Sequence, residues 1–249
     1  MATWSDIDWA QPWLAPYRAL GERATVLIEQ GHPTHEALNA VRGSASSPAL
    51  AAGPLCFVAP EALPAGVAYE AFIARTAGVP TRHNLHDFFN GLVWLTWPAL
   101  KRRLHEIQAR QIAQLGVSGT RGAVRDAVTL FDENGALFEA PRTLQQALIE
   151  RDWLGLFLTH REQWRQARFV IVGHALLEQL VQPRKPLCAH VWLNELAGQG
   201  AFDASDLQPK PFAPLPVLGV PGWWAANAEP AFYADPAVFR APRSQALAI

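Results

Sequence analysis

The chain has 249 residues, of which 50% are hydrophobic and 17% charged, and its formal net charge at pH 7 is −1. Such a chain can bury a sizeable core, and its charge gives no general attraction for nucleic acids. No apolar run approaches the roughly 20 residues that a membrane-spanning helix needs, so neither a membrane nor a nucleic-acid partner is expected.

Residues 1–16 contain three tryptophans and two prolines, which predicts an irregular aromatic arm that lies on the core. Helices are expected from Tyr17 to Gln30 and from Thr34 to Arg42. The small residues of 43–54 are typical of a flexible loop or lid. Acidic residues come early and no basic segment precedes them, so a signal peptide is not expected and the predicted location is the cytoplasm.

The stretch 84–94 is the centre of the sequence, because it places an imidazole, a carboxylate and an amide in a strongly apolar segment. Asn84 is expected to cap a helix here. The apolar residues recur at positions i, i+3, i+4, i+7 and i+8, which is the pattern of a buried helix face.

The segments on either side of this helix have clear signals as well. Residues 55–59 form a short apolar run that predicts a strand, and 67–77 predicts a helix. Pro98 fits the first turn of another helix, which continues to Leu115. This helix carries three basic residues, 101–103, which we interpret as a solvated face.

Further along the chain, Asn134-Gly135 lies between two apolar runs. That arrangement predicts a β-hairpin over 127–138, with glycine at a position of positive φ. Strands are then expected over 168–172 and 187–193, with a helix from His174 to Val181 between them. Two more helices are expected to begin at Thr143 and Asp152.

From residue 201 the chain is rich in proline and aromatic residues, which predicts extended coil that wraps the body without regular ladders. The predicted fold class is therefore α+β. We expect a mainly helical single domain over 1–249, with a small sheet or hairpin and an irregular C-terminal segment over 201–249. A Gly-rich dinucleotide fingerprint is absent, which argues against a doubly wound fold.

Several motifs together resemble one protein family. They are Asn-Leu-His-Asp-Phe-Phe-Asn (84–90), Thr-Leu-Phe-Asp-Glu-Asn-Gly (129–135), Gly-His-Ala-Leu-Leu-Glu (173–178) and Pro-Gly-Trp-Trp (221–224). The chain is similar to the family called domain of unknown function 3025, found in Gram-negative bacteria. The resemblance covers nearly the whole chain and implies a bacterial, single-domain protein. It implies no reaction and no catalytic residues.

Two pairs of residues are the catalytic candidates: His86 with Asp87, and His174 with Glu178. An imidazole at the border of a core acts as a base, a metal ligand or a hydrogen-bonded structural group. Asp87 has the simpler alternative of capping its helix, and His174 and Glu178 that of an ordinary i, i+4 surface pair. Because buried charges need partners, we expect the two pairs to face one another across a pocket.

Asn90, Trp94 and Asp126 are the candidate substrate-binding residues. Asn90 and Trp94 continue the helix face of His86, while Asp126 lies next to Arg125 at the start of the predicted hairpin. For Asp126 the alternative is a structural pair with that arginine.

Two functions from different classes fit this sequence. The first is an enzyme of hydrolase or lyase type, with a His/acid pocket for a small molecule and possible assistance by a metal. The second is a non-catalytic domain that binds a ligand or a protein, in which the His and Asp motifs are structural. The sequence leaves the cofactor, the metal and the oligomeric state open.

Overall fold

The computed structural model describes residues 2–43, 49–115, 122–195 and 197–242. It is 55% helical and 13% strand, which confirms the predicted α+β class. The helices are α1 (Arg18–Glu29), α2 (Thr34–Arg42), α3 (Tyr69–Thr76), α4 (Leu85–Thr96), α5 (Pro98–Leu115), α6 (Ala123–Asn134), α7 (Arg142–Glu150) and α8 (His174–Gln179).

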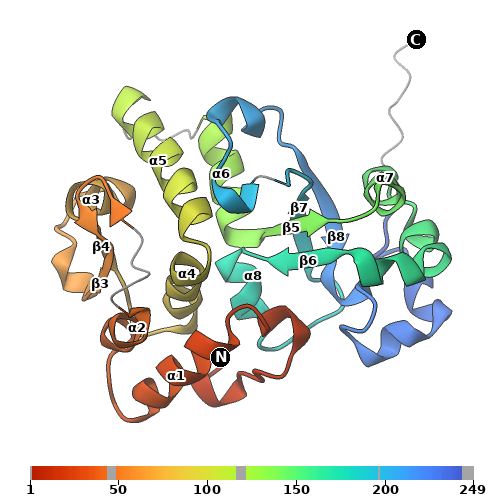
Figure 1. The fold of residues 1–249 in the computed structure, drawn as a ribbon, viewed down its shortest axis with the longest axis horizontal. Helices are drawn as coiled ribbons and strands as arrows, with labels where there is room; N and C mark the ends of the chain where they lie inside the picture. Colours follow the sequence, from red (N-terminus) through yellow and green to blue (C-terminus); the bar gives the residue numbers. More distant parts are fainter. Residues whose placement is uncertain (1, 44–48, 116–121, 196, 243–249) are drawn as a thin grey trace.

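The strands form three small sheets. They are β1 (Ala49–Leu50), β2 (Gly53–Pro54), β3 (Cys56–Val58), β4 (Gly78–Pro80), β5 (Gly135–Glu139), β6 (Arg168–Ile171), β7 (Cys188–Trp192) and β8 (Phe212–Pro216). Strands β1 and β2 pair antiparallel, β3 and β4 pair parallel, and the main sheet has the order β6-β5-β7-β8. Figure 1 shows α4 and α8 between the β3–β4 pair and the main sheet.

The main sheet has hydrophobic side chains on both faces. Ala136 and Phe138 belong to the larger core cluster, whereas Leu137 belongs to a second cluster with α5 and α6. This alternation follows from the two-residue period of a strand. A strand covered on both faces reads as a continuous apolar run, which is why β5 is almost entirely buried.

Helix α4 forms as the sequence predicts. The side chain of Asn84 accepts a hydrogen bond of 2.8 Å from the backbone N–H of Asp87, so it caps the helix. Phe88, Phe89 and Leu92 are fully buried. Helix α4 contacts α2, α5 and α8, so a polar side chain on it is held within the body of the protein.

The predicted hairpin over 127–138 is wrong. Residues 123–134 form α6, and β5 begins directly at Gly135, whose φ is −74° rather than positive. The physical reason is a helical period that outweighs the Asn-Gly turn signal. Val124, Val128 and Phe131 recur at i, i+4 and i+7 and are buried together.

The expectation that the C-terminal segment makes no ladder is also wrong, because 212–216 forms β8 and pairs antiparallel with β7. Strand β8 lies at the edge of the sheet. Pro214 and Pro216 are two residues apart, so the N–H groups that they lack lie on the same side, and an edge strand tolerates this on its outer side. The rest of the segment up to residue 242 consists of short turns that pack on the body, with Tyr233 and Phe239 buried.

The aromatic arm packs on the core as predicted. Trp13 is buried, and the ring of Trp4 lies against His83 and Phe88. The predicted loop or lid over 43–54 includes 44–48, which lie outside the described residues, and the part from Ala49 to Pro54 forms the β1–β2 pair.

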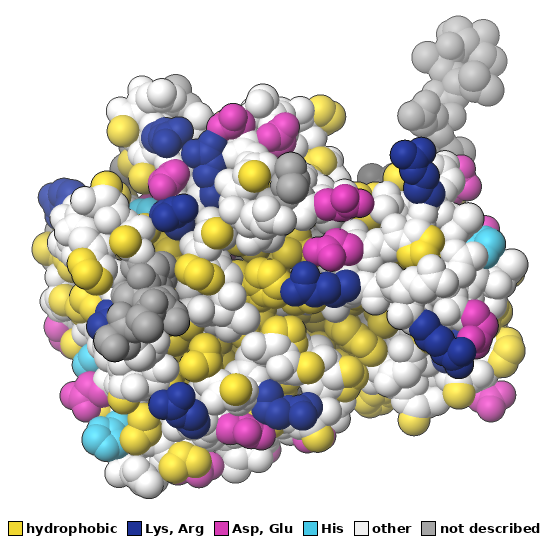
Figure 2. All heavy atoms as spheres, viewed as in Figure 1, with side chains coloured by type: hydrophobic (Ala, Val, Ile, Leu, Met, Phe, Trp, Pro, Cys, Tyr) yellow, Lys and Arg dark blue, Asp and Glu magenta, His cyan; other side chains and the backbone are white. Residues whose placement is uncertain are grey.

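Figure 2 shows one face of the molecule. Hydrophobic side chains gather in its middle, and basic and acidic side chains are interspersed around them. Among the residues coloured there, charges of one sign form no large patch, in keeping with the low net charge. Within the described ranges, the structure contains no helix that is both long and apolar enough to cross a membrane.

Candidate functional site

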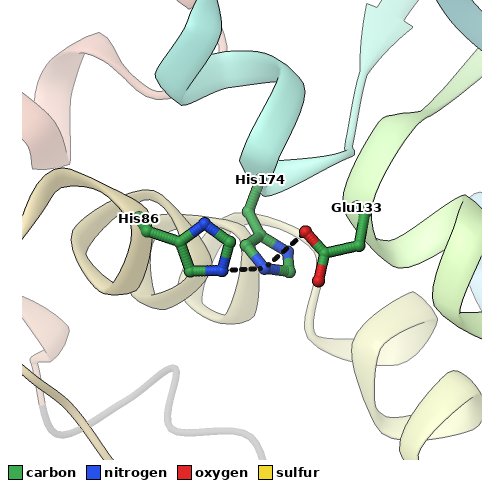
Figure 3. A group of neighbouring side chains, drawn as sticks. All are labelled: His86, Glu133 and His174. Atoms are coloured by element: carbon green, nitrogen blue, oxygen red, sulfur yellow. Dashed lines mark hydrogen bonds and ion pairs between the residues drawn. The ribbon is translucent and has the colours of Figure 1, made fainter.

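The two histidines singled out in the sequence meet in the structure. His86 lies on the first turn of α4 and His174 is the first residue of α8, and their Nε2 atoms are 3.1 Å apart. On its other side, Nδ1 of His86 lies 3.0 Å from Oε2 of Glu178. Figure 3 shows the two rings pointing toward each other from different helices.

Helix α6 brings two further carboxylates to the same place. Oε2 of Glu133 lies 3.5 Å from Nε2 of His174, and Oδ2 of Asp132 lies 3.8 Å from Nδ1 of His174. Nδ1 of His174 is buried and has no hydrogen-bond partner among the described residues. His174 is therefore placed between two acids of one helix turn.

Two glycines allow this close approach of α6 and α8. The backbone N–H of Gly173 donates a 2.9 Å hydrogen bond to the carbonyl of Gly135. A Cβ atom on Gly173 would lie 2.5 Å from the Cα of Asn134, a distance that real Cβ contacts do not reach. Glycine at 173 thus sets the distance between His174 and the acids that precede Gly135.

Lys101 lies at the centre of a buried polar network. Its Nζ donates to Oδ1 of Asp132 at 2.6 Å and to Oδ1 of Asn90 at 2.8 Å. Asn90 in turn donates to the hydroxyl of Tyr69 at 3.2 Å. This network joins α3, α4, α5 and α6, so a cation that the sequence assigns to a solvated face is instead part of the site.

Asp87 has a more structural position. Its carboxylate accepts from the backbone N–H of Arg82 at 2.6 Å, and from the Nε and Nη2 atoms of Arg82 at 3.1 and 2.9 Å. The helix cap itself is Asn84. The carboxylate of Asp87 therefore fixes the loop before α4 through Arg82, although it also borders the cavity described next.

These side chains border one cavity of about 500 Å³, which is within the usual range of small-molecule sites, about 300–1,000 Å³. It lies between α3, α4, α5, α6 and the start of α8. Its lining residues are Pro60, Leu63, Tyr69, Glu70, Ile73, Pro80, Arg82, His86, Asp87, Asn90, Trp94, Lys101, Leu104, His105, Gln108, Thr129, Asp132, Glu133 and His174.

The lining is electrically unbalanced. It includes four carboxylates, of Glu70, Asp87, Asp132 and Glu133, against the cations Arg82 and Lys101. With neutral histidines the formal charge of the lining is about −2 at neutral pH. The cavity therefore favours a cation or a cationic group over a second anion.

Burial and neighbouring charges perturb several of these groups. Burial lowers the pKa of His174 to about 4, so its imidazole is neutral at pH 7. Burial raises the pKa of Glu133 above its usual value. Burial alone would also raise the pKa of Asp132, but the charge of Lys101 together with His174 holds it below its usual value.

A metal ion is one group that such a site can hold. The donor atoms of His86, Glu133 and His174 all lie within 4.8 Å of one another. Two imidazoles and one carboxylate are a common set of protein ligands for catalytic metals, because such a set leaves coordination positions free.

The structure thus brings together five of the residues singled out in the sequence. His86, Asp87, Asn90, Trp94 and His174 line the cavity, and their catalytic or binding roles remain predictions. Glu178 does not line it but contacts His86 from behind.

Asp126 is not part of this group. The cavity lining, taken over the described part of the chain, does not include it. It lies in the first turn of α6, whereas the acids of the site lie in the last turn, roughly 9 Å farther along the helix axis.

Two residues of the site carried no recognisable signal. Glu133 has the appearance of a turn residue next to Asn134-Gly135, and Lys101 that of a surface charge next to Arg102 and Arg103. The helical period of 124–131 is the signal that would have placed Glu133 on α6, one turn after Thr129.

A comparison with curated proteins and a comparison with solved structures both gave no significant match. A comparison with family models gave a match over residues 55–243, which is most of the chain and includes every residue of the site. The chain therefore belongs to the family described as Protein of unknown function (DUF3025).

Proposed function

We propose that this protein is an enzyme that acts on a small molecule in the cavity of about 500 Å³, with chemistry of the hydrolase or lyase type. The observation that carries the proposal is the convergence of His86, His174 and Glu133 at the wall of that cavity. Imidazole and carboxylate are the groups that transfer protons or bind a catalytic metal in such reactions.

The crowding of like charges supports a functional role. Asp132 and Glu133 are neighbours, and Glu178 lies behind His86. The charges of Asp132 and Glu178 both add to the upward shift in the pKa of Glu133. Such repulsion opposes stability, and it is typical of sites in which chemistry, rather than stability, requires the acids.

The rest of the lining can hold a substrate. The amide of Asn90 and the hydroxyl of Tyr69 offer hydrogen bonds, and Trp94 offers a flat apolar surface. Ile73 and Leu104 add further apolar surface. This mixture of a few placed polar groups and apolar walls is usual for small-molecule sites.

The proposed place of action is the cytoplasm of a bacterium. Cys56 and Cys188 are both free thiols, as is usual in a reducing compartment. Cell fractionation of the native host, with an antibody against the protein, tests this placement, and recovery in the periplasmic fraction would contradict it.

The functional test is a small-molecule screen that reads the shift in melting temperature of three proteins. They are the wild type, His86→Ala and the control His83→Ala. His83 also carries an imidazole and lies just before α4, but it contacts Thr34 and Trp4 outside the cavity. We expect compounds that stabilise the wild type and His83→Ala and do not stabilise His86→Ala.

Compounds found in this way are then incubated with the wild type and followed by NMR. Conversion by the wild type and its loss in His86→Ala would support the enzyme. Binding without conversion would instead support the non-catalytic alternative. Equal stabilisation of His86→Ala and the wild type would contradict any role of this site.

A further inference from the structure

We infer that His86, His174 and Glu133 form the protein side of a centre for a divalent transition-metal ion. The ligands are Nε2 of each histidine and one carboxylate oxygen of Glu133, and the remaining coordination positions face the cavity. The inference deepens the proposed function by naming a cofactor for the same cavity. It rests on that function for the role of the ion but not for its binding.

The distances fit a common metal ion. Ligands bound at about 2.0–2.2 Å lie about 3.0–3.6 Å from one another in octahedral or tetrahedral coordination. The two Nε2 atoms are 3.1 Å apart, and Nε2 of His174 is 3.5 Å from Oε2 of Glu133. Figure 3 shows the three side chains converging from α4, α8 and α6.

The carboxylates behind the histidines orient them for this role. Nδ1 of His86 lies 3.0 Å from Glu178, and Nδ1 of His174 lies 3.8 Å from Asp132. A metal-bound histidine usually donates its other ring N–H to such a carboxylate. For His174 a small turn of the ring would convert the 3.8 Å approach into that hydrogen bond and satisfy the buried Nδ1.

The same arrangement is difficult to satisfy without a cation. If both Nδ1 atoms carry protons that face Glu178 and Asp132, both Nε2 atoms present lone pairs to each other at 3.1 Å. A metal ion between them removes this repulsion. The competing explanation is a doubly protonated His86, which donates to Glu178 and to His174.

The ligand set also selects the class of metal. Imidazole nitrogen with carboxylate oxygen suits zinc, iron, manganese, cobalt or nickel, whereas calcium and magnesium prefer all-oxygen sites. A divalent ion would offset the formal charge of about −2 of the cavity lining. Bound there, it would act as a Lewis acid or activate a water for the reaction.

The test is calorimetric titration of chelator-treated protein with zinc, manganese, magnesium and calcium chlorides. We expect one equivalent of zinc or manganese per chain and much weaker binding of magnesium and calcium. The absorption spectrum of the cobalt(II)-loaded protein reports nitrogen and oxygen ligands independently of activity.

Matched variants locate the ion. Glu133→Gln and His86→Gln should each weaken zinc binding at least tenfold, and Glu178→Gln roughly 10–100-fold. Glu70→Gln is the control, because Glu70 is another carboxylate of the lining that instead accepts a hydrogen bond from Gln108. It should bind zinc as the wild type does. Circular dichroism of the metal-free variants shows whether each is folded, and His86, which is partly exposed, is the substitution least likely to disturb folding.

The outcomes distinguish this inference from the proposed function. If the wild type binds none of these ions, or if Glu133→Gln and His86→Gln bind zinc as tightly as the wild type, the metal centre is wrong. Small molecules that need His86 would then still support the enzyme. Zinc bound at these residues without any such small molecule would support the metal centre and count against the enzyme.

Discussion

Lys101 and Arg102 are adjacent in the sequence, yet they have opposite environments. The side chain of Lys101 is 5% exposed and pairs with Asp132, whereas that of Arg102 is 50% exposed and lies 3.8 Å from Glu106. Successive residues of a helix point about 100° apart, so one faces the cavity and the next faces solvent. The expectation of a solvated face therefore holds for Arg102 and is wrong for Lys101.

We expect Lys101→Met to lower the free energy of unfolding by about 3 kcal/mol, because it leaves the carboxylate of Asp132 without its cation. Arg102→Met removes only an exposed pair and should cost less than about 1 kcal/mol. Urea unfolding of both variants measures the difference. Adding Asp132→Asn to Lys101→Met should restore part of the loss. Equal costs for the two single variants would show that Lys101 is not a buried ionic partner.

His105 should make the stability of the protein depend on pH. Burial, assisted by the charge of Lys101, lowers its pKa to about 4, although Asp132 and Glu106 act in the opposite direction. In the unfolded chain the pKa is about 6.5. As the pH falls from 6.5 toward 4, the unfolded chain takes up a proton that the folded chain does not, so stability falls.

The loss for this single group approaches about 1.4 kcal/mol per pH unit between those two values. His105→Gln should therefore be less sensitive than the wild type when urea unfolding is compared at pH 7 and pH 5. Part of the dependence remains, since the pKa of His174 is shifted in the same direction. His83→Gln, at an exposed position, should behave as the wild type does. An unchanged pH dependence in His105→Gln would contradict this assignment.

At the scale of single residues, the sequence supports a prediction wherever a polar group interrupts an apolar segment. His86 and His174 stand out for this reason, and both border the cavity. Glu133 and Lys101 do not stand out, because each has polar neighbours in the sequence and only the orientation of its helix directs it inward. The pairing of His174 with Glu133 also requires two helices to meet, which local patterns do not encode.

At the scale of elements, the junctions between α6 and β5 and between β6 and α8 determine the site. Asn134-Gly135 is the end of a helix rather than a hairpin turn. Gly135 is needed there for a steric reason rather than for positive φ, because a Cβ atom would lie 2.3 Å from the carbonyl oxygen of Phe131. Gly173 packs directly against this junction.

We expect Gly173→Ala to destabilise the protein by roughly 1–3 kcal/mol, since its methyl group would require the backbone of Asn134 to move. Gly198→Ala is the control. Its Cβ atom would first meet a methyl group of Leu137, at 3.2 Å, which can move aside. Thermal unfolding of both variants tests this, and a neutral Gly173→Ala would show that the two junctions are not closely packed.

At the scale of the whole molecule, helices with strong periodicity were predictable and the pairing of strands was not. Helices α4 and α5 follow from apolar spacing and from the capping or proline residue at their start. The parallel pairing of β5 with β7 joins segments about 50 residues apart, and no turn signal specifies it. The path of the C-terminal segment likewise depends on surfaces that exist only after folding.

The expectation of one domain over 1–249 predicts that the chain end and the centre unfold together. Phe239 is 6% exposed, and its ring lies 5.9 Å from that of Phe157 and 5.2 Å from that of Tyr233. The next residue accepts a 2.8 Å hydrogen bond from the indole of Trp153. The end of the described chain is thus tied to the middle of the sequence.

We therefore expect Phe239→Ala to lower the free energy of unfolding by roughly 3–5 kcal/mol, while Leu154→Ala, at a side chain that is 58% exposed, should change it by about 0.5 kcal/mol or less. Tryptophan fluorescence and far-ultraviolet circular dichroism should give the same midpoint in urea for the wild type, and in Phe239→Ala both should shift by the same amount, because a single cooperative unit has one transition. If only the fluorescence midpoint moves in Phe239→Ala, the C-terminal segment unfolds separately and the single-domain expectation is wrong.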